Sequence, residues 1–211
     1  MIRSLSEFIS ANSIKGFLAD DEGEALFRLA QSITGVGPCL EIGSYCGKST
    51  VYIGAACKQT GNILFSVDHH RGSEEHQPGE EYHDVDLLNE NKISVNSFPM
   101  FQRTLRLAAL EENVIPIVTD SRLLARHWRM PLGMVFIDGG HSHESAMHDC
   151  VEWSKHIPPG GILAVHDIFP DPQSGGQGPY LAFTKIAAFS EWVFYDQINS
   201  LGILRRNKIH P

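Results

Sequence analysis

The sequence has few cysteines, no long apolar run and no excess of basic residues. The four cysteines form no Cys-x-x-Cys pair, and three of them lie in apolar or helical surroundings typical of reduced, buried thiols. No apolar run reaches the ~20 residues of a membrane span, and the polar, mixed amino terminus does not resemble a signal peptide. These absences favour a cytoplasmic protein without a membrane partner.

The net charge and the length of the chain further limit its expected partners and its number of domains. The net charge of −8 argues against binding to nucleic acid, because that binding depends on clustered Lys and Arg. A chain of 211 residues suits one domain with an ordinary core. We expect a single domain over residues 1–211 that acts on a small molecule, and a homodimer is compatible with this picture.

Strand and helix patterns alternate along most of the chain. Two amphipathic helices, at 6–10 and 21–32, are expected to form an N-terminal helical cap over residues 1–37. Strands are then expected at 39–42, 62–67, 115–118, 133–137 and 161–165, and helices at 49–58, 100–110, 121–127, 144–156 and 179–189. This alternation predicts an α/β fold with a parallel sheet and helices on both faces. Strands at 192–197 and 202–206, joined by a turn, add an antiparallel hairpin and make seven strands.

The stretch Leu40-Glu41-Ile42-Gly43-Ser44-Tyr45-Cys46-Gly47-Lys48 indicates a ligand site where a strand breaks into a glycine turn. Glycines permit close ligand approach, and the helix that follows offers unpaired N–H groups. A phosphate-binding P-loop needs four residues between its glycines, and only three stand here. The dinucleotide fingerprint needs a different glycine spacing. We expect Glu41 at the strand tip to reach polar groups of a cofactor.

Two further strand ends carry candidate cofactor ligands. Asp68 ends the second strand, where an acid can accept from both ribose hydroxyls. A helix-capping or turn aspartate is the alternative. Asp120 and Ser121 follow the third strand, at the sheet edge where ligands of open α/β folds gather. A helix N-cap explains Asp120 nearly as well.

The ends of the fourth and fifth strands carry the strongest chemical pattern, with Asp138 and His141 after one and His166-Asp167 after the other. Ligands gather at the carboxyl ends of strands in open α/β sheets. Carboxylates favour hard divalent cations, and imidazole is tolerated by softer ones. Asp138, His166 and Asp167 are therefore candidate metal ligands. Turn and capping acids with surface histidines are the alternative.

Residues 72–97 form the longest connection and are rich in Glu, His and Asn. Loops of this length are usually functional or disordered. We predict a lid insertion here, with a solvated charged loop as the alternative.

The glycine turn resembles motif I of the S-adenosylmethionine-dependent methyltransferases with a Rossmann-like fold, and the closing hairpin matches their sheet. The order Asp-Gly-x-His, Pro-Gly-Gly and His-Asp resembles the metal-dependent small-molecule O-methyltransferases of the catechol and macrolide-sugar types, over about residues 39–206. The resemblance implies S-adenosylmethionine as cofactor, magnesium at Asp138, His166 and Asp167, and His141 as the catalytic base. An imidazole at position 166, where those families more usually carry Asp or Glu, leaves manganese, zinc or no metal open.

The expected function is therefore S-adenosylmethionine-dependent O-methylation of a small-molecule hydroxyl. The cofactor-binding residues predicted from the turn, the strand ends and the resemblance are Glu41, Gly43, Ser44, Gly47, Ser49, Asp68, Asp120, Ser121 and Asp138. A metal-independent methyltransferase and a non-catalytic protein that binds an adenosyl ligand are the alternatives.

Overall fold

A seven-stranded sheet forms the centre of the molecule in the computed structural model, which describes residues 4–72, 84–89 and 94–208. The strands are β1 (Cys39–Ile42), β2 (Leu64–Asp68), β3 (Val114–Val118), β4 (Met134–Ile137), β5 (Ile162–Val165), β6 (Trp192–Ile198) and β7 (Leu201–Arg206), in the order β3-β2-β1-β4-β5-β7-β6. Strands β1 to β5 are parallel, and β7 runs antiparallel to both β5 and β6. The predicted mixed sheet with its closing hairpin is confirmed.

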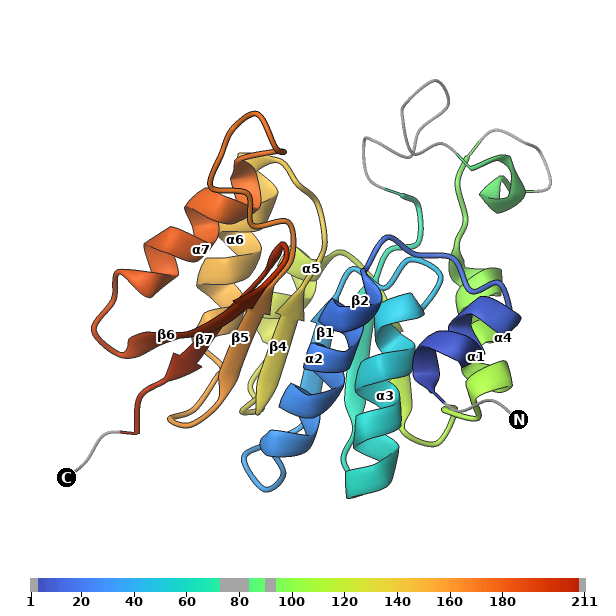
Figure 1. The fold of residues 1–211 in the computed structure, drawn as a ribbon, viewed down its shortest axis with the longest axis horizontal. Coiled ribbons are helices and arrows are strands. Elements are labelled where there is room, and N and C mark those ends of the chain that lie inside the picture. Colours follow the sequence, from blue (N-terminus) through green and yellow to red (C-terminus); the bar gives the residue numbers. More distant parts are fainter. Residues whose placement is uncertain (1–3, 73–83, 90–93, 209–211) are drawn as a thin grey trace.

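Helices cover both faces of this sheet (Figure 1). One face is packed by α1 (Leu5–Ala11), α2 (Asp20–Ser32), α3 (Lys48–Thr60) and α4 (Phe98–Ala108), and the other by α5 (Ser121–His127), α6 (His143–Ser154) and α7 (Gly178–Ala187). A short 3-10 turn, η2, spans Val85–Leu87. Within the described residues, no helix combines the length and apolar character needed to cross a membrane.

The apolar composition of the central strands agrees with their complete burial. Strands β1, β4 and β5 are buried at every residue, as expected for parallel strands with helices on both faces. Within β1, Leu40 belongs to the core under α5–α7, whereas Cys39 belongs to the core under α1–α4. Glu41, a fully buried carboxylate, lies on the same side of the sheet as Cys39 and contacts α3.

Helix α4 begins two residues before the predicted start. Pro99 lies in its first turn, where a missing N–H disrupts no helical hydrogen bond. The helix ends at Ala108 because Ala109 takes the left-handed conformation, with φ 50°. The sequence pattern missed both signals.

The strand order places a crevice where a ligand can bind. Strand β1 pairs with β2 on one side and β4 on the other, so the order of the strands reverses at β1 and β4. Connections leave such a switch point in opposite directions, and ligands bind outside the carboxyl ends of these strands. The lid predicted for residues 72–97 lies largely outside the described residues, because 73–83 and 90–93 are among those not described.

Candidate active site

A cavity of about 760 Å³ opens at the carboxyl ends of the parallel strands. The predicted residues that line it are Gly43, Ser44, Ser49, Asp68, Asp120, Ser121, Asp138, His141, His166 and Asp167. The N-terminal segment contributes Phe17 to the wall, and the connection after β5 contributes Phe169. Two predicted residues, Glu41 and Gly47, lie outside the lining.

The turn after β1 requires glycine at both predicted positions. Gly43 has φ 84°, and a Cβ there would collide with the carbonyl oxygen of Asp138. Gly47 has φ 93° and is the N-cap of α3. Positive φ is accessible to glycine without the steric cost that a side chain brings. The turn therefore brings bare backbone to the cavity.

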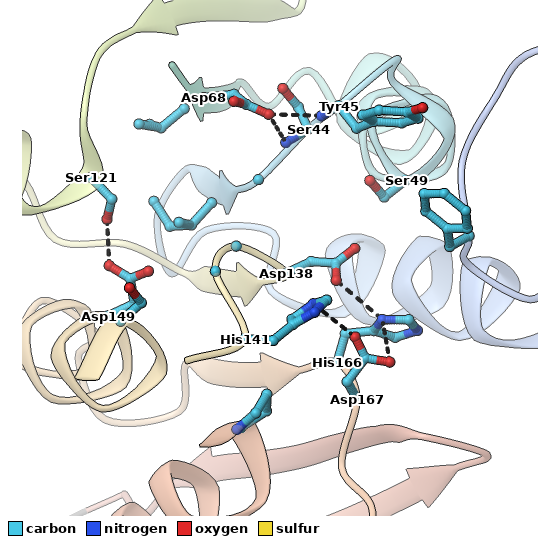
Figure 2. A pocket seen from close by; sticks show the side chains of 18 of the residues that line it. Ser44, Tyr45, Ser49, Asp68, Ser121, Asp138, His141, Asp149, His166 and Asp167 are labelled. Atoms are coloured by element: carbon cyan, nitrogen blue, oxygen red, sulfur yellow. Dashed lines mark hydrogen bonds and ion pairs between the residues drawn. The ribbon is translucent and has the colours of Figure 1, made fainter. Parts of the chain in front are cut away.

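Asp68 holds this turn from the neighbouring strand. Its Oδ2 accepts hydrogen bonds from the backbone amides of Ser44 (3.0 Å) and Tyr45 (2.8 Å) (Figure 2). Its Oδ1 accepts from the amide of His70 (2.7 Å). Asp68 thus has the turn role that the sequence left open, while it also lines the cavity. Contact with a ribose stays a prediction.

Ser44 offers a hydroxyl without a partner. Its side chain is buried, with 2% of the residue exposed, and Oγ makes no hydrogen bond within the part of the chain that the structure describes. Buried polar groups are nearly always satisfied by protein, water or ligand, so this hydroxyl is a candidate contact for a molecule bound in the cavity.

Glu41 lies behind the turn, in contrast to the prediction that it reaches a cofactor. Its Oε1 accepts from the hydroxyl of Ser49 (2.6 Å), and its Oε2 accepts from Thr50 (2.6 Å) and Ser66 (2.7 Å). Burial raises the pKa of Glu41 to about 7, although the three hydroxyls act in the opposite direction. The side chain points into the core because alternation in β1 places it opposite Leu40 and Ile42. Its role is to join β1, β2 and α3.

The end of β3 contains a buried polar group that the sequence did not indicate. Asp120 caps α5 by accepting from the amides of Arg122 and Leu123, which is the alternative role expected from the sequence. Ser121 donates to Asp149 on α6 at 2.6 Å (Figure 2). It also accepts from the indole of Trp153 at 2.8 Å. Asp149 also lines the cavity, and burial raises its pKa. An acid at a core-facing position of a helix was the only sequence signal.

His166 is held by carboxylates at both ring nitrogens. Nδ1 lies 3.1 Å from Oδ1 of Asp138, and Nε2 lies 3.0 Å from Oε2 of Glu22. A carboxylate only accepts, so both nitrogens donate and the ring is an imidazolium. Burial alone would lower the pKa of His166, but the charge of Asp138 and the hydrogen bonds to the carboxylates raise it far above its usual range. Both ring nitrogens are thus engaged by carboxylates in this arrangement, and a role for His166 as a metal ligand stays a prediction.

A different third residue completes the cluster. Asp138, His141 and Asp167 each offer one ligand atom, and these atoms lie within 4.8 Å of one another. Nε2 of His141 lies 3.0 Å from Oδ2 of Asp167, and all three side chains come together beneath the glycine turn in Figure 2. The structure thus brings together the predicted base and two of the three predicted metal ligands.

Asp167 carries the strongest local constraint in this cluster. It has φ 58°, a conformation that L-residues other than Asn and Asp rarely adopt. Burial alone would raise the pKa of Asp167, but the hydrogen bonds and charges of His141 and His166 hold it well below its usual range. The carboxylate therefore stays ionised beside the cavity.

The comparisons with known proteins agree with this geometry. A family model described as a methyltransferase domain matches residues 40–168. The O-methyltransferase from Bacillus cereus, solved in complex with SAH, superposes with a TM-score of 0.63 at 18% identity over 97% of this chain and 90% of that chain. The O-methyltransferase TomG from Streptomyces achromogenes, solved with SAM, gives 0.64 at 15% identity over 97% and 88%. The likeness to these structures shows the fold, and the match to the family model over more than half of the sequence shows that this chain belongs to the methyltransferase-domain family.

Proposed function

We propose that this protein transfers the methyl group of S-adenosylmethionine to a hydroxyl of a small molecule. One observation carries the proposal: the Asp138, His141 and Asp167 cluster opens into the same cavity as the glycine turn. Methyl transfer is an in-line displacement, so donor and acceptor must share one cavity with a proton acceptor at the oxygen.

The cofactor half of the cavity fits an adenosyl ligand with a polar amino-acid end. Gly43 and Ser44 line the cavity, and the hydroxyl of Ser44 has no hydrogen-bond partner among the described residues. Asp68 and Asp120 present carboxylates at neighbouring strand ends. Bound SAM supplies an electrophilic methyl group, and these residues would orient it toward the ends of β4 and β5.

On the acceptor side, His141 is the proposed proton acceptor. Because its Nε2 contacts Asp167, the neutral ring carries its hydrogen on Nε2 and its lone pair on Nδ1. Asp167 fixes the ring orientation and stabilises the imidazolium that forms when His141 takes the proton. This is the role of the carboxylate in any Asp–His pair that acts as a general base.

The same three residues fit a divalent cation. Two carboxylates and one imidazole suit manganese or zinc, and the carboxylates alone suit magnesium. A cation bound there would make an acceptor hydroxyl more acidic. If such a cation is bound, His141 acts as its ligand, and another group must take the proton of the acceptor hydroxyl.

Calorimetry with S-adenosylmethionine, S-adenosylhomocysteine, NAD and ATP tests the cofactor assignment. Tighter binding of NAD or ATP than of S-adenosylmethionine or S-adenosylhomocysteine would contradict the proposal. An assay of methyl transfer to catechols, flavonoids and glycosylated natural products then tests the reaction. Turnover that survives exhaustive chelation favours the metal-independent alternative, and adenosyl binding without any transfer favours the non-catalytic one.

A further inference from the structure

Glu22 on α2 is a buried carboxylate that does not line the cavity. Only 2% of the residue is exposed, and four donors converge on its two oxygens. Oε2 accepts from the amide of Ala19 (3.0 Å) and from Nε2 of His166 (3.0 Å). Oε1 accepts from the amide (3.0 Å) and the hydroxyl (2.9 Å) of Ser200, in the turn between β6 and β7.

These contacts connect α2 to the acceptor side of the cavity. The other ring nitrogen of His166, Nδ1, lies 3.1 Å from the carboxylate of Asp138 and 3.5 Å from that of Asp167. Without Glu22, Nε2 of His166 would keep one contact, with the hydroxyl of Ser200 at 3.4 Å. Glu22 therefore sets the orientation of the ring that both acceptor-side carboxylates contact.

Stability alone does not account for a carboxylate at this place. Removing a carboxylate and an imidazolium from water is costly, and well-packed apolar residues are often as stabilising as a buried ion pair. A buried pair with satisfied hydrogen bonds does, however, fix one arrangement of its members. The arrangement fixed here includes Asp138 and Asp167.

We propose that Glu22 is a positioning residue for methyl transfer, which acts through His166 to hold Asp138 and Asp167 in their working orientation. The inference rests on the proposed function, because it takes these two carboxylates as the acceptor-side groups. It connects α2 to the site at the carboxyl ends of β4 and β5.

The variant Glu22→Gln isolates this role, because it preserves the size of the side chain. One of its two terminal atoms becomes an N–H₂ group, which cannot accept and would face the donor of either His166 or Ser200. Glu24→Gln is the matched control: Glu24 lies on the same helix, is exposed, and pairs with Arg28 at 3.7 Å. Residues that orient site ligands from behind typically contribute about 10- to 100-fold to activity.

We expect Glu22→Gln to lower kcat by about 10- to 100-fold, while the Kd for S-adenosylhomocysteine changes by less than about twofold. Glu24→Gln should match the wild type in both. In a His166→Gln background, adding Glu22→Gln should have little further effect on kcat, because residues that act through one another are not additive. A general loosening of the fold would weaken cofactor binding as well and would persist in that background. Wild-type kcat in Glu22→Gln, or an additive double variant, would overturn the inference.

A second readout needs no methyl acceptor. In the S-adenosylhomocysteine complex of the intact protein, nuclear magnetic resonance should show that the signal of the Asp138 carboxyl carbon shifts in Glu22→Gln relative to the wild type. An unchanged Asp138 signal would refute the positioning role. If the wild type methylates no hydroxyl, the proposed function fails, and this signal still decides whether Glu22 positions Asp138.

Discussion

The carboxylate of Asp68 accepts a hydrogen bond from the backbone amide of Ser44 at 3.0 Å, so the acid at the end of β2 fixes the turn that follows β1. The same oxygen accepts from the amide of Tyr45 at 2.8 Å. One side chain therefore sets the shape of the backbone that the proposed cofactor contacts. Loss of this side chain affects the cofactor site even if the carboxylate never touches the ligand.

Replacing Asp68 by Ala should weaken binding of S-adenosylhomocysteine by about 1 to 3 kcal/mol, because it leaves buried amides without an acceptor. Isothermal titration calorimetry measures this loss. Asp196→Ala, an exposed acid on β6 at the far edge of the sheet, is the control and should bind like the wild type. Equal affinity in Asp68→Ala would contradict the role of Asp68 in the turn.

Replacing His141 by Ala should reduce turnover by about 10²- to 10⁴-fold, the usual contribution of a general base. The Kd for S-adenosylmethionine should change little, because His141 lies on the acceptor side. His127→Ala serves as the control, since His127 is exposed in the last turn of α5. Undiminished turnover in His141→Ala would remove the residue from the mechanism.

Glu41 should make stability depend on pH. Its pKa in the folded protein, about 7, lies above the ordinary value of 4.5, so the folded state holds the proton more tightly. Its stabilising contribution is complete below about pH 4.5 and is lost as the pH rises through about 7. The full change is on the order of 3 kcal/mol.

Thermal unfolding of the wild type and of Glu41→Gln between pH 5 and 8 isolates this effect, because other titrating groups cancel in the difference. The Tm of the wild type should fall relative to the variant as the pH rises. A constant difference would show that Glu41 does not titrate in this range. Retained affinity of Glu41→Gln for S-adenosylhomocysteine would further support its place behind the turn.

Manganese binding tests the cation site. If the cluster holds a divalent ion, Asp138→Asn should weaken manganese affinity by at least about 10-fold, since even residues behind a ligand contribute that much. Electron paramagnetic resonance of free manganese measures the affinity. Asp171→Asn, an exposed acid outside the cavity lining, should bind like the wild type. Equal affinity in the wild type and Asp138→Asn would place the ion elsewhere.

Local patterns predicted most of the fold. Apolar runs between glycines located β1, β4 and β5 at nearly their observed bounds, and the helix at 121–127 matches α5. Because carboxyl ends of parallel strands meet at one edge, the sequence also predicted which side chains gather at the cavity. Chain direction alone places Asp68, Asp138 and Asp167 there.

The partners of those side chains were not predictable in the same way. His166 was predicted as a ligand from its place beside Asp167 at the end of the fifth strand, but its Nε2 contacts Glu22, which is 144 residues away. Periodicity carries no information about such a contact. Glu41 shows the same limit: its position at a strand end suggested ligand contact, whereas the hydroxyls of Thr50 and Ser66 bind it within the core.

The antiparallel hairpin has a consequence for biosynthesis. Strand β7 fits between β5 and β6, and the turn before it supplies both Ser200 contacts to Glu22. Chains emerge from the ribosome amino terminus first, so a nascent chain that lacks β7 already has the glycine turn and Asp68 but not the contacts that complete the surroundings of His166. Completion of the surroundings of His166 therefore requires the last hairpin of the chain, which is synthesised after every other part of the site.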